Sequence, residues 1–235
     1  MKKSLSLALA LLFLICFVGC KSGEAVSNDS KITEATQEQI TTATQTNSED
    51  SAIIAPLPIS IDIANLKDCM VAISLEKGDF CKDENGAVMM QVTVFVYDFY
   101  DMQSVALMKA GDIILRNGKE VQISSIERNQ NGVVLINGGL DNGGFELYAE
   151  EDDTVYYERG YSDTKSYYEL GKATLPVSED FIYTDTSDLD NEAKIFNTND
   201  FLQDSSVIDY HFNANNTTIR IENGFVVEMT RIYTP

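Results

Sequence analysis

Apolar and polar residues alternate along most of the chain with a period of two, which is typical of β-strands that bury one face. The clearest example is the stretch 88–97, in which every second residue is apolar. Its apolar face is formed by Val88, Met90, Val92, Val94 and Val96. Further strands are predicted at 70–75, 112–115, 121–123, 133–136, 145–148, 155–158, 173–177, 181–184, 217–222 and 225–233. The pattern therefore predicts a mainly β fold.

Asparagine–glycine pairs, such as Asn223-Gly224, separate several of these predicted strands. Such a pair tolerates positive φ at both turn positions and favours a tight hairpin. Two short helices are also predicted, one at 101–108 capped by Asp101 and one at 200–202 capped by Asn199. Many short strands joined by tight turns predict a small bent β-barrel or sandwich with one or two short helices. The short helix that leads into the strand at 112 favours the barrel.

The first residues form a separate segment. Lys2 and Lys3 precede an almost wholly apolar run over 5–18. This run is shorter than the ~20 apolar residues that a membrane-spanning helix needs, and it suits the apolar core of a signal peptide. The run ends at 17–20 with Phe-Val-Gly-Cys, which resembles the lipobox of bacterial lipoproteins. The resemblance implies that a 1–19 signal peptide is removed and that the thiol of Cys20 carries lipid.

The next segment, 20–58, is predicted to be a lipidated cysteine followed by a flexible tether. Residues 21–50 are rich in Ser, Thr, Gln, Asn and Glu and lack aromatic residues, so they offer little apolar surface to bury. Pro56 and Pro58 mark its end. Residues 59–235 are then predicted to form a single acidic β-rich domain. The expected location is the extracytoplasmic face of the cell membrane, with the lipid as the membrane contact.

The formal net charge of −20 narrows the possible partners. A strongly negative field repels nucleic acid, so no nucleic-acid partner is expected. It is compatible with a cation, a basic protein or an uncharged glycan. Of the four cysteines, Cys69 and Cys81 remain for the exported domain. An even pair in an exported domain is compatible with a disulfide, and two buried thiols are the alternative.

Few catalytic motifs are available to this chain. His211 is the only histidine, and no zinc-protease, Cys-x-x-Cys, Gly-x-Ser-x-Gly or phosphate-loop motif is present. We therefore predict no catalytic residue. Paired carboxylates leave a glycan hydrolase open as an alternative, although carboxylate pairs arise by chance in a chain with 37 acidic residues.

Two groups of residues are candidate binding sites. The first is an acidic loop, whose closely spaced oxygen donors are what Ca²⁺ requires. The alternative is a solvated loop on the surface of a very acidic protein, and no cofactor is required. Its candidate ligands are Asp185, Asp188, Asp190 and Glu192. The second group is Tyr161, Tyr167 and Tyr168, which could line a glycan or peptide groove or simply belong to a strand surface.

Residues 111–121, 125–144, 175–190 and 216–235 resemble segments of uncharacterised cell-surface lipoproteins of gut Clostridia and related Firmicutes. The resemblance covers most of 59–235 and implies a location and a fold, but no activity. The expected function is a membrane-anchored, non-enzymatic binding or envelope-assembly module. A carboxylate-based glycan hydrolase and a calcium-stabilised structural spacer remain open as alternatives.

Overall fold

The computed structural model describes residues 51–151, 154–203 and 208–234. The predicted signal peptide, the predicted lipidation site Cys20 and the predicted tether as far as residue 50 lie outside these residues. Within the described part, no helix is both long and apolar enough to cross a membrane.

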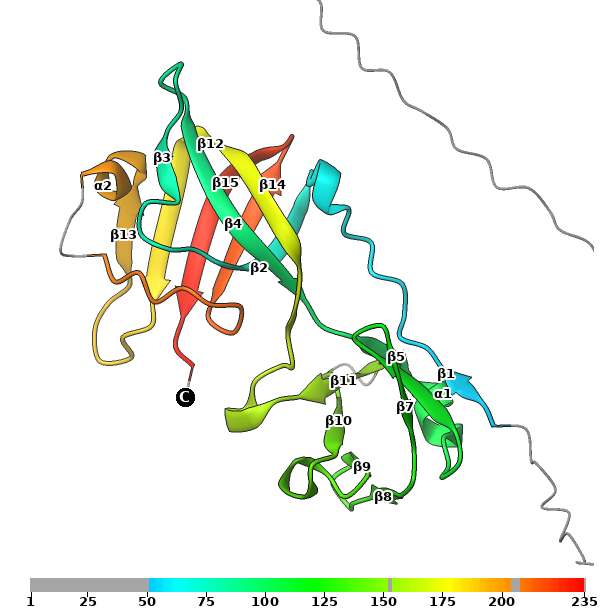
Figure 1. The fold of residues 1–235 in the computed structure, drawn as a ribbon. Helices are drawn as coiled ribbons and strands as arrows, with labels where there is room; N and C mark the ends of the chain where they lie inside the picture. The colour runs from blue at the N-terminus through cyan, green and yellow to red at the C-terminus, as the bar shows by residue number, and fades with distance from the viewer. Residues whose placement is uncertain (1–50, 152–153, 204–207, 235) are drawn as a thin grey trace, which may run out of the picture. The chain divides into compact units, whose positions relative to one another are not determined.

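One part of the fold is a closed barrel of five strands (Figure 1). The order β12-β15-β14-β2-β4 returns to β12, because β4 pairs with the first part of β12. These strands are β2 (Cys69–Ser74), β4 (Val88–Val96), β12 (Tyr168–Thr186), β14 (Thr217–Glu222) and β15 (Phe225–Ile232). Two further strands extend it, β3 (Phe80–Lys82) beside β4 and β13 (Lys194–Asn197) beside β12. The prediction of a mainly β fold with a small barrel is confirmed.

The long strand β12 is what closes the barrel. Its first part pairs antiparallel with β4, from Tyr168 opposite Val96 to Pro176 opposite Met89. Its second part pairs in parallel with β15, from Val177 opposite Val226 to Thr186 opposite Ile232, with a register shift between Val177 and Ile182. Nineteen residues of strand span ~60 Å at ~3.3 Å per residue, which is enough to serve both neighbours. The sequence predicted two separate strands here, at 173–177 and 181–184, and the structure joins them.

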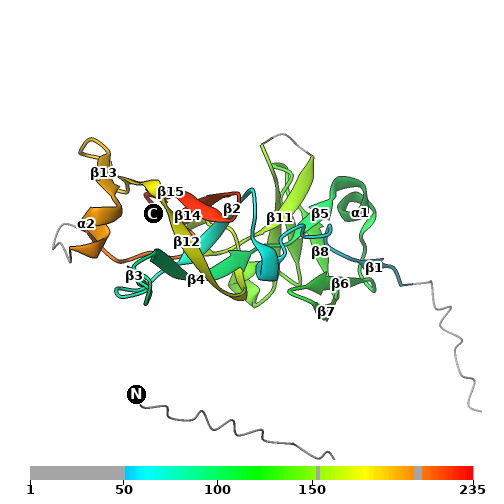
Figure 2. The same ribbon diagram turned by 90° about the horizontal axis from the view of Figure 1, so that it is seen from above.

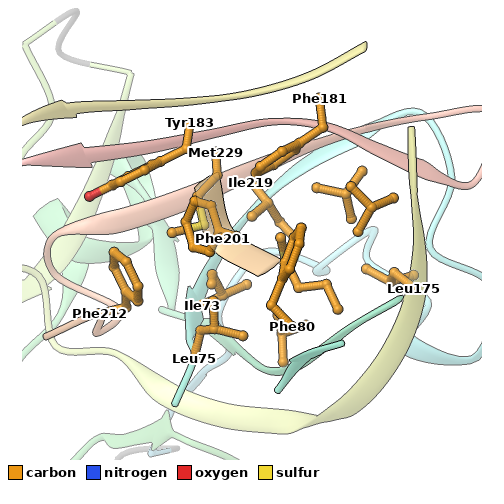
Figure 3. Packing of buried hydrophobic residues seen from close by; sticks show 14 of the residues in the cluster. Ile73, Leu75, Phe80, Leu175, Phe181, Tyr183, Phe201, Phe212, Ile219 and Met229 are labelled. Carbon is orange, nitrogen blue, oxygen red and sulfur yellow. The ribbon is translucent and has the colours of Figure 1, made fainter. Parts of the chain in front are cut away.

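The barrel interior is filled by aromatic and aliphatic side chains (Figure 3). Phe201 comes from helix α2 (Thr198–Leu202) and is buried among them. Its ring centroid lies 4.8 Å from that of Phe80 and 5.2 Å from that of Tyr183. Helix α2 lies next to β13 in both overall views (Figure 2). The predicted cap of this helix, Asn199, is wrong: Asn197 caps it, with its side chain accepting a hydrogen bond from the backbone N–H of Asn199.

A second β structure has its own core, which includes Tyr100, Ile114 and Leu147. Its five-stranded sheet consists of β5 (Phe99–Asp101), β11 (Val155–Arg159), β10 (Phe145–Ala149), β9 (Val134–Ile136) and β8 (Ile126–Arg128) in that order. Its three-stranded sheet consists of β1 (Ile53–Ile54), β6 (Ile113–Arg116) and β7 (Lys119–Gln122). The helix predicted near 101–108 is α1 (Met102–Leu107), and Asp101 caps it as expected.

Short 3-10 turns also occur among the described residues. They are η1 (Ile63–Asn65), η2 (Leu140–Asn142) and η3 (Tyr161–Asp163). At the end of η2, a Cβ on Gly144 would lie 2.0 Å from the carbonyl oxygen of Ile136. This close backbone contact accounts for a glycine at that position.

The structured part begins before the expected boundary at Ile59. Ile53 and Ile54 form β1 and pair in parallel with β6, and the backbone N–H of Ala52 donates to Asp112 Oδ1 at 3.0 Å. Residues 52–58 were expected to belong to the tether, and that expectation is wrong. A strand of two residues is too short to show the alternation by which strands are recognised in a sequence.

Candidate ligand-binding surface

The outer face of β2 forms the floor of the candidate site. Alternate residues of a strand point to opposite faces, so Val71 and Ile73 enter the barrel core while Met70, Ala72 and Ser74 face outward. Phe95 of β4 lies opposite Ala72 in the strand register. The floor therefore changes along one strand from a thioether at Met70 to a hydroxyl at Ser74.

Above the Ser74 end is a cleft of about 500 Å³, which we call the tyrosine cleft. Tyr161 forms one wall and is 75% exposed; Tyr167 forms another and is half-buried. The cleft is lined by Ser74, Phe95, Tyr161, Ser162, Thr164, Tyr167, Asn213, Ala214, Asn215 and Thr234. Aromatic faces surrounded by hydroxyl and amide groups can stack on a ligand and hydrogen-bond to it at the same time.

The turn that carries Tyr161 is held in a defined conformation. Ser162 and Asp163 both have positive φ, 57° and 61°, which costs energy for residues other than glycine. The turn is fastened by the Thr164 hydroxyl, which donates to the carbonyl of Tyr161 at 2.8 Å, and by an ion pair between Arg159 and Asp163. The exposed ring of Tyr161 is thus presented by a fixed backbone.

Above the Met70 end is an apolar groove of about 370 Å³. Met70 is 63% exposed in its floor. The segment 58–61, which precedes η1, forms one side of the groove. The complete lining consists of Pro58, Ile59, Ser60, Ile61, Met70, Val71, Ala72, Phe95, Val96, Tyr97, Phe99, Tyr167 and Thr218. Side chains of apolar or aromatic character predominate in this hollow.

The tyrosine cleft and the apolar groove share two wall residues, Phe95 and Tyr167. Every residue that lines either hollow is uncharged, although charged residues make up 23% of the chain. Other hollows on the described surface differ in this respect. The one beside β10 and β11 contains Glu150, Glu151 and Lys165, for example. The two adjoining hollows therefore form an uncharged surface on a strongly acidic protein.

A lysine supports the aromatic walls from behind. The ammonium of Lys165 lies 4.3 Å from the ring centroid of Tyr97 and 4.9 Å from that of Tyr157, and 2.5 Å from Glu150 Oε1. Tyr97 in turn contacts the ring of Tyr167 edge-on, with centroids 5.1 Å apart. Cation–π contacts and the ion pair together hold these rings in place. Tyr167 is thus a preorganised wall.

The pKa values of this group are consistent with a partly dry environment. Burial raises the pKa of the Tyr97 phenol, and it also raises that of Tyr167. For Lys165, burial acts to lower the pKa, but hydrogen bonds to Glu150 and Tyr97 outweigh it and the net shift is upward. At neutral pH, Lys165 is therefore a cation and the tyrosines are neutral.

The third predicted tyrosine lies outside both hollows. The hydroxyl of Tyr168 donates to Asp98 Oδ1 at 2.9 Å, and the backbone N–H of Asn117 donates to Asp98 Oδ2 at 2.8 Å. Asp98 itself is only 3% exposed. Tyr168 is thus a structural partner of a buried carboxylate. The structure brings together Tyr161 and Tyr167 of the predicted trio, and the placement of Tyr168 in a ligand groove is wrong.

The acidic loop is not arranged as a metal site. Asp185 accepts hydrogen bonds from Tyr183 Oη and Ser187 Oγ and lies 3.6 Å from Arg231 Nη1. Asp188 accepts from the amide of Asn191, while Asp190 and Glu192 are exposed. Among the residues that the structure describes, no three His, Cys, Asp or Glu side chains gather as metal ligands. The candidate calcium site at Asp185, Asp188, Asp190 and Glu192 is therefore not formed here.

Cys69 and Cys81 are both free, with Cys69 half-buried and Cys81 exposed, so the structure has neither the possible disulfide nor the alternative of two buried thiols. Cys69 lies in β2 opposite Ile221 of β14, whereas Cys81 lies in β3 opposite Met89 of β4. The two cysteines therefore belong to different pairs of strands.

The two carboxylates whose pKa values are shifted do not suit the role of general acid in a hydrolase. For Asp101, hydrogen bonds from Ser104 lower the pKa. For Asp185, burial acts to raise the pKa, but hydrogen bonds from Ser187 and Tyr183 prevail and the pKa is lowered. A general acid needs a raised pKa, so both shifts are in the opposite direction. His211 is exposed and pairs with Asp209.

Several residues of the surface were not predicted, among them Met70, Phe95, Asn213 and Asn215. They come from three separate parts of the chain, and only the pairing of β2 with β4 and the path of the chain before β14 bring them together. The exposed Met70 was a weak signal, because it occupies the solvent side of a predicted strand. Comparison with protein-family models, with curated proteins and with solved structures gave no match.

Proposed function

We propose that the protein is an extracytoplasmic, lipid-anchored and non-enzymatic binding module, and that the tyrosine cleft binds an uncharged glycan. The observation that carries the proposal is the exposed ring of Tyr161 beside Tyr167, in a cleft rimmed only by uncharged hydroxyl, amide and apolar groups. Sugar rings present apolar C–H faces and hydroxyl groups, and this lining offers a partner for each of them.

The absence of charged residues in the cleft favours a neutral glycan over a cation or a basic protein, which the composition also allowed. A cation or a basic protein would be held by carboxylates, yet the cleft lining contains no charged residue. An anionic glycan would be repelled by the net charge of −20. A neutral glycan needs no carboxylate to bind and is not repelled by the net charge. The hydrolase alternative receives no support from the lowered pKa values of Asp101 and Asp185.

Calorimetric titration with a panel of soluble hexasaccharides tests the proposal. The panel contains neutral oligomers of β-1,4-glucose, α-1,4-glucose, mannose, xylose and N-acetylglucosamine, with hexagalacturonate as the anionic control. The protein is the full chain with Cys20→Ser, which prevents acylation. We expect at least one neutral oligomer to bind and hexagalacturonate not to bind.

Variants of Tyr161 identify the site. Tyr161→Ala is expected to weaken binding at least tenfold, because a stacked aromatic ring at the centre of a site commonly contributes more than ~1.4 kcal/mol. Tyr161→Phe keeps the ring and is expected to change the affinity less than threefold. Phe225→Ala, at a ring 48% exposed on the β14–β15 hairpin, is the matched control. Binding of none of the neutral oligomers, or binding that is unaffected by Tyr161→Ala, would contradict the proposal.

A further inference from the structure

The apolar groove adjoins the tyrosine cleft, and the proposed function does not use it. The two hollows lie over the same strand, with Ser74 beneath the cleft and Met70 and Ala72 beneath the groove. Residues two apart on a strand are ~6.6 Å apart. Phe95 and Tyr167 stand at the boundary and contribute to both hollows. The two residues that the hollows share are thus aromatic and uncharged.

The two hollows differ in chemistry. The cleft is rimmed by the side chains of Ser162, Thr164, Asn213 and Asn215, all of which are able to hydrogen-bond to a ligand. The groove has only the hydroxyls of Ser60, Thr218 and the tyrosines among aliphatic and aromatic groups. A purely polar saccharide would leave the groove unused, and a purely apolar chain would leave the amides of the cleft unpaired.

We propose that the ligand is a neutral amphipathic glycoconjugate, whose saccharide lies in the tyrosine cleft and whose hydrocarbon chain lies in the apolar groove. This assignment rests on the proposed function and specifies its ligand class. It is supported by the shared walls, the common strand floor and the absence of charge over both linings. The exposed Met70 gives the groove a flexible apolar floor that adapts to a chain.

Alkyl maltosides with hexyl, octyl and decyl chains, used below the concentrations at which they form micelles, test the assignment. Each methylene that moves from water into the groove is expected to tighten binding about fourfold, because burial of one methylene stabilises by ~0.8 kcal/mol. The affinity is thus expected to rise about 15-fold from hexyl to octyl. Tetra(ethylene glycol) ethers of the same chains are expected to bind more weakly than the maltosides.

The variant Met70→Glu places a charge in the floor of the groove and is expected to abolish the dependence on chain length. Met70 is 63% exposed on the outer face of β2, so the new carboxylate is solvated and the barrel is expected to be retained. Leu107→Glu, at an equally exposed apolar residue of α1, is the matched control and is expected to leave the chain-length dependence intact.

The outcomes distinguish this inference from the proposed function. Affinity that does not depend on chain length would overturn the inference, whereas the hexasaccharide panel would still decide whether the cleft binds glycans. Equal affinity for the maltosides and the tetra(ethylene glycol) ethers would also overturn it, because the groove would then hold a chain without a saccharide in the cleft. A chain-length dependence that survives Met70→Glu would place the chain elsewhere and overturn the inference as well.

Discussion

At the scale of single residues, the environment of Asp98 shows how a buried charge is accommodated. Its carboxylate is 3% exposed and accepts hydrogen bonds from the Tyr168 hydroxyl and the Asn117 backbone. Burial and the hydrogen bond to Asp98 raise the pKa of Tyr168 to about 12. When a buried carboxylate loses a hydrogen-bond donor, part of the cost of removing it from water is no longer offset, and the folded state is destabilised. Tyr168 is therefore a stability residue, in contrast to Tyr161 and Tyr167.

Tyr168→Phe tests this role. The change is expected to lower the free energy of unfolding by about 1–3 kcal/mol at pH 7, because it removes a hydrogen bond to a buried carboxylate. Chemical denaturation measures the loss. Tyr161→Phe, at the exposed ring, is the matched control and is expected to cost less than about 0.5 kcal/mol. Equal stability of the two variants would show that the bond from Tyr168 to Asp98 contributes nothing.

The raised pKa of Tyr168 also predicts how the stability of the fold changes at alkaline pH. In the unfolded chain this tyrosine loses its proton near pH 10, whereas in the folded protein it keeps the proton until about pH 12. The unfolded state therefore binds fewer protons in this window, and stability falls as the pH rises. We expect the fall between pH 10 and pH 12 to be less steep in Tyr168→Phe than in the parent protein. An unchanged slope would contradict the assigned pKa.

At the scale of elements, α2 shows how a five-residue helix is stabilised. Such a short helix is not stable by itself. It is held by a capping box and by the buried ring of Phe201. In the capping box, the Asn197 side chain accepts a hydrogen bond from the backbone N–H of Asp200, and the Asp200 side chain accepts one from the backbone N–H of Asn197. That ring contacts Phe80, Phe181 and Tyr183 in the barrel interior (Figure 3). The packing of Phe201, and not helix propensity, therefore determines the position of α2.

Phe201→Ala is expected to lower the free energy of unfolding by about 3–5 kcal/mol, because it leaves a cavity among packed aromatic rings. Asn197→Ala, which removes only the cap, is expected to cost about 1 kcal/mol. Thermal and chemical unfolding of both variants measure the difference. If removing the cap cost as much as removing the ring, the anchoring role assigned to Phe201 would be wrong.

The sequence predicted most strands because each one alternates in polarity, but it did not predict how they pair. Nothing in the pattern of 168–186 indicates that one strand serves both β4 and β15. The same limit applies to the candidate surface. Tyr161 and Tyr167 were recognised because tyrosines cluster in that part of the sequence, whereas Phe95 and Asn213 depend on pairings between distant segments. The same limit applies to Cys69 and Cys81, which are twelve positions apart in the sequence, because strand pairing places Cys69 beside β14 and Cys81 beside β4.

At the scale of the whole molecule, the proposed function joins a lipid anchor to a binding domain. The predicted anchor at Cys20 lies outside the residues that the structure describes. At least two acyl chains on that cysteine would hold the protein on the membrane firmly, whereas one chain binds only marginally. The uncharged surface would then be displayed outside the cytoplasmic membrane, where neutral glycans and glycolipids are found.

Labelling with radioactive palmitate tests the anchor. In the native bacterium, the parent protein is expected to incorporate the label and to sediment with membranes, whereas Cys20→Ser is expected to do neither. Cys69→Ser removes a different thiol and serves as the control that keeps the label. A parent protein without label, or label that persists in Cys20→Ser, would contradict the anchored location.

The central claim is that the tyrosine cleft is the surface that binds a neutral glycan. The most direct measurement is a map of the amide resonances of ¹⁵N-labelled Cys20→Ser protein, recorded with and without an equimolar mixture of the five neutral hexasaccharides. We predict that the resonances of Ser74, Tyr161, Asn213 and Asn215 shift, while those of the acidic loop at 185–192 stay in place. A spectrum that does not change, or changes confined to residues outside the cleft, would contradict the claim.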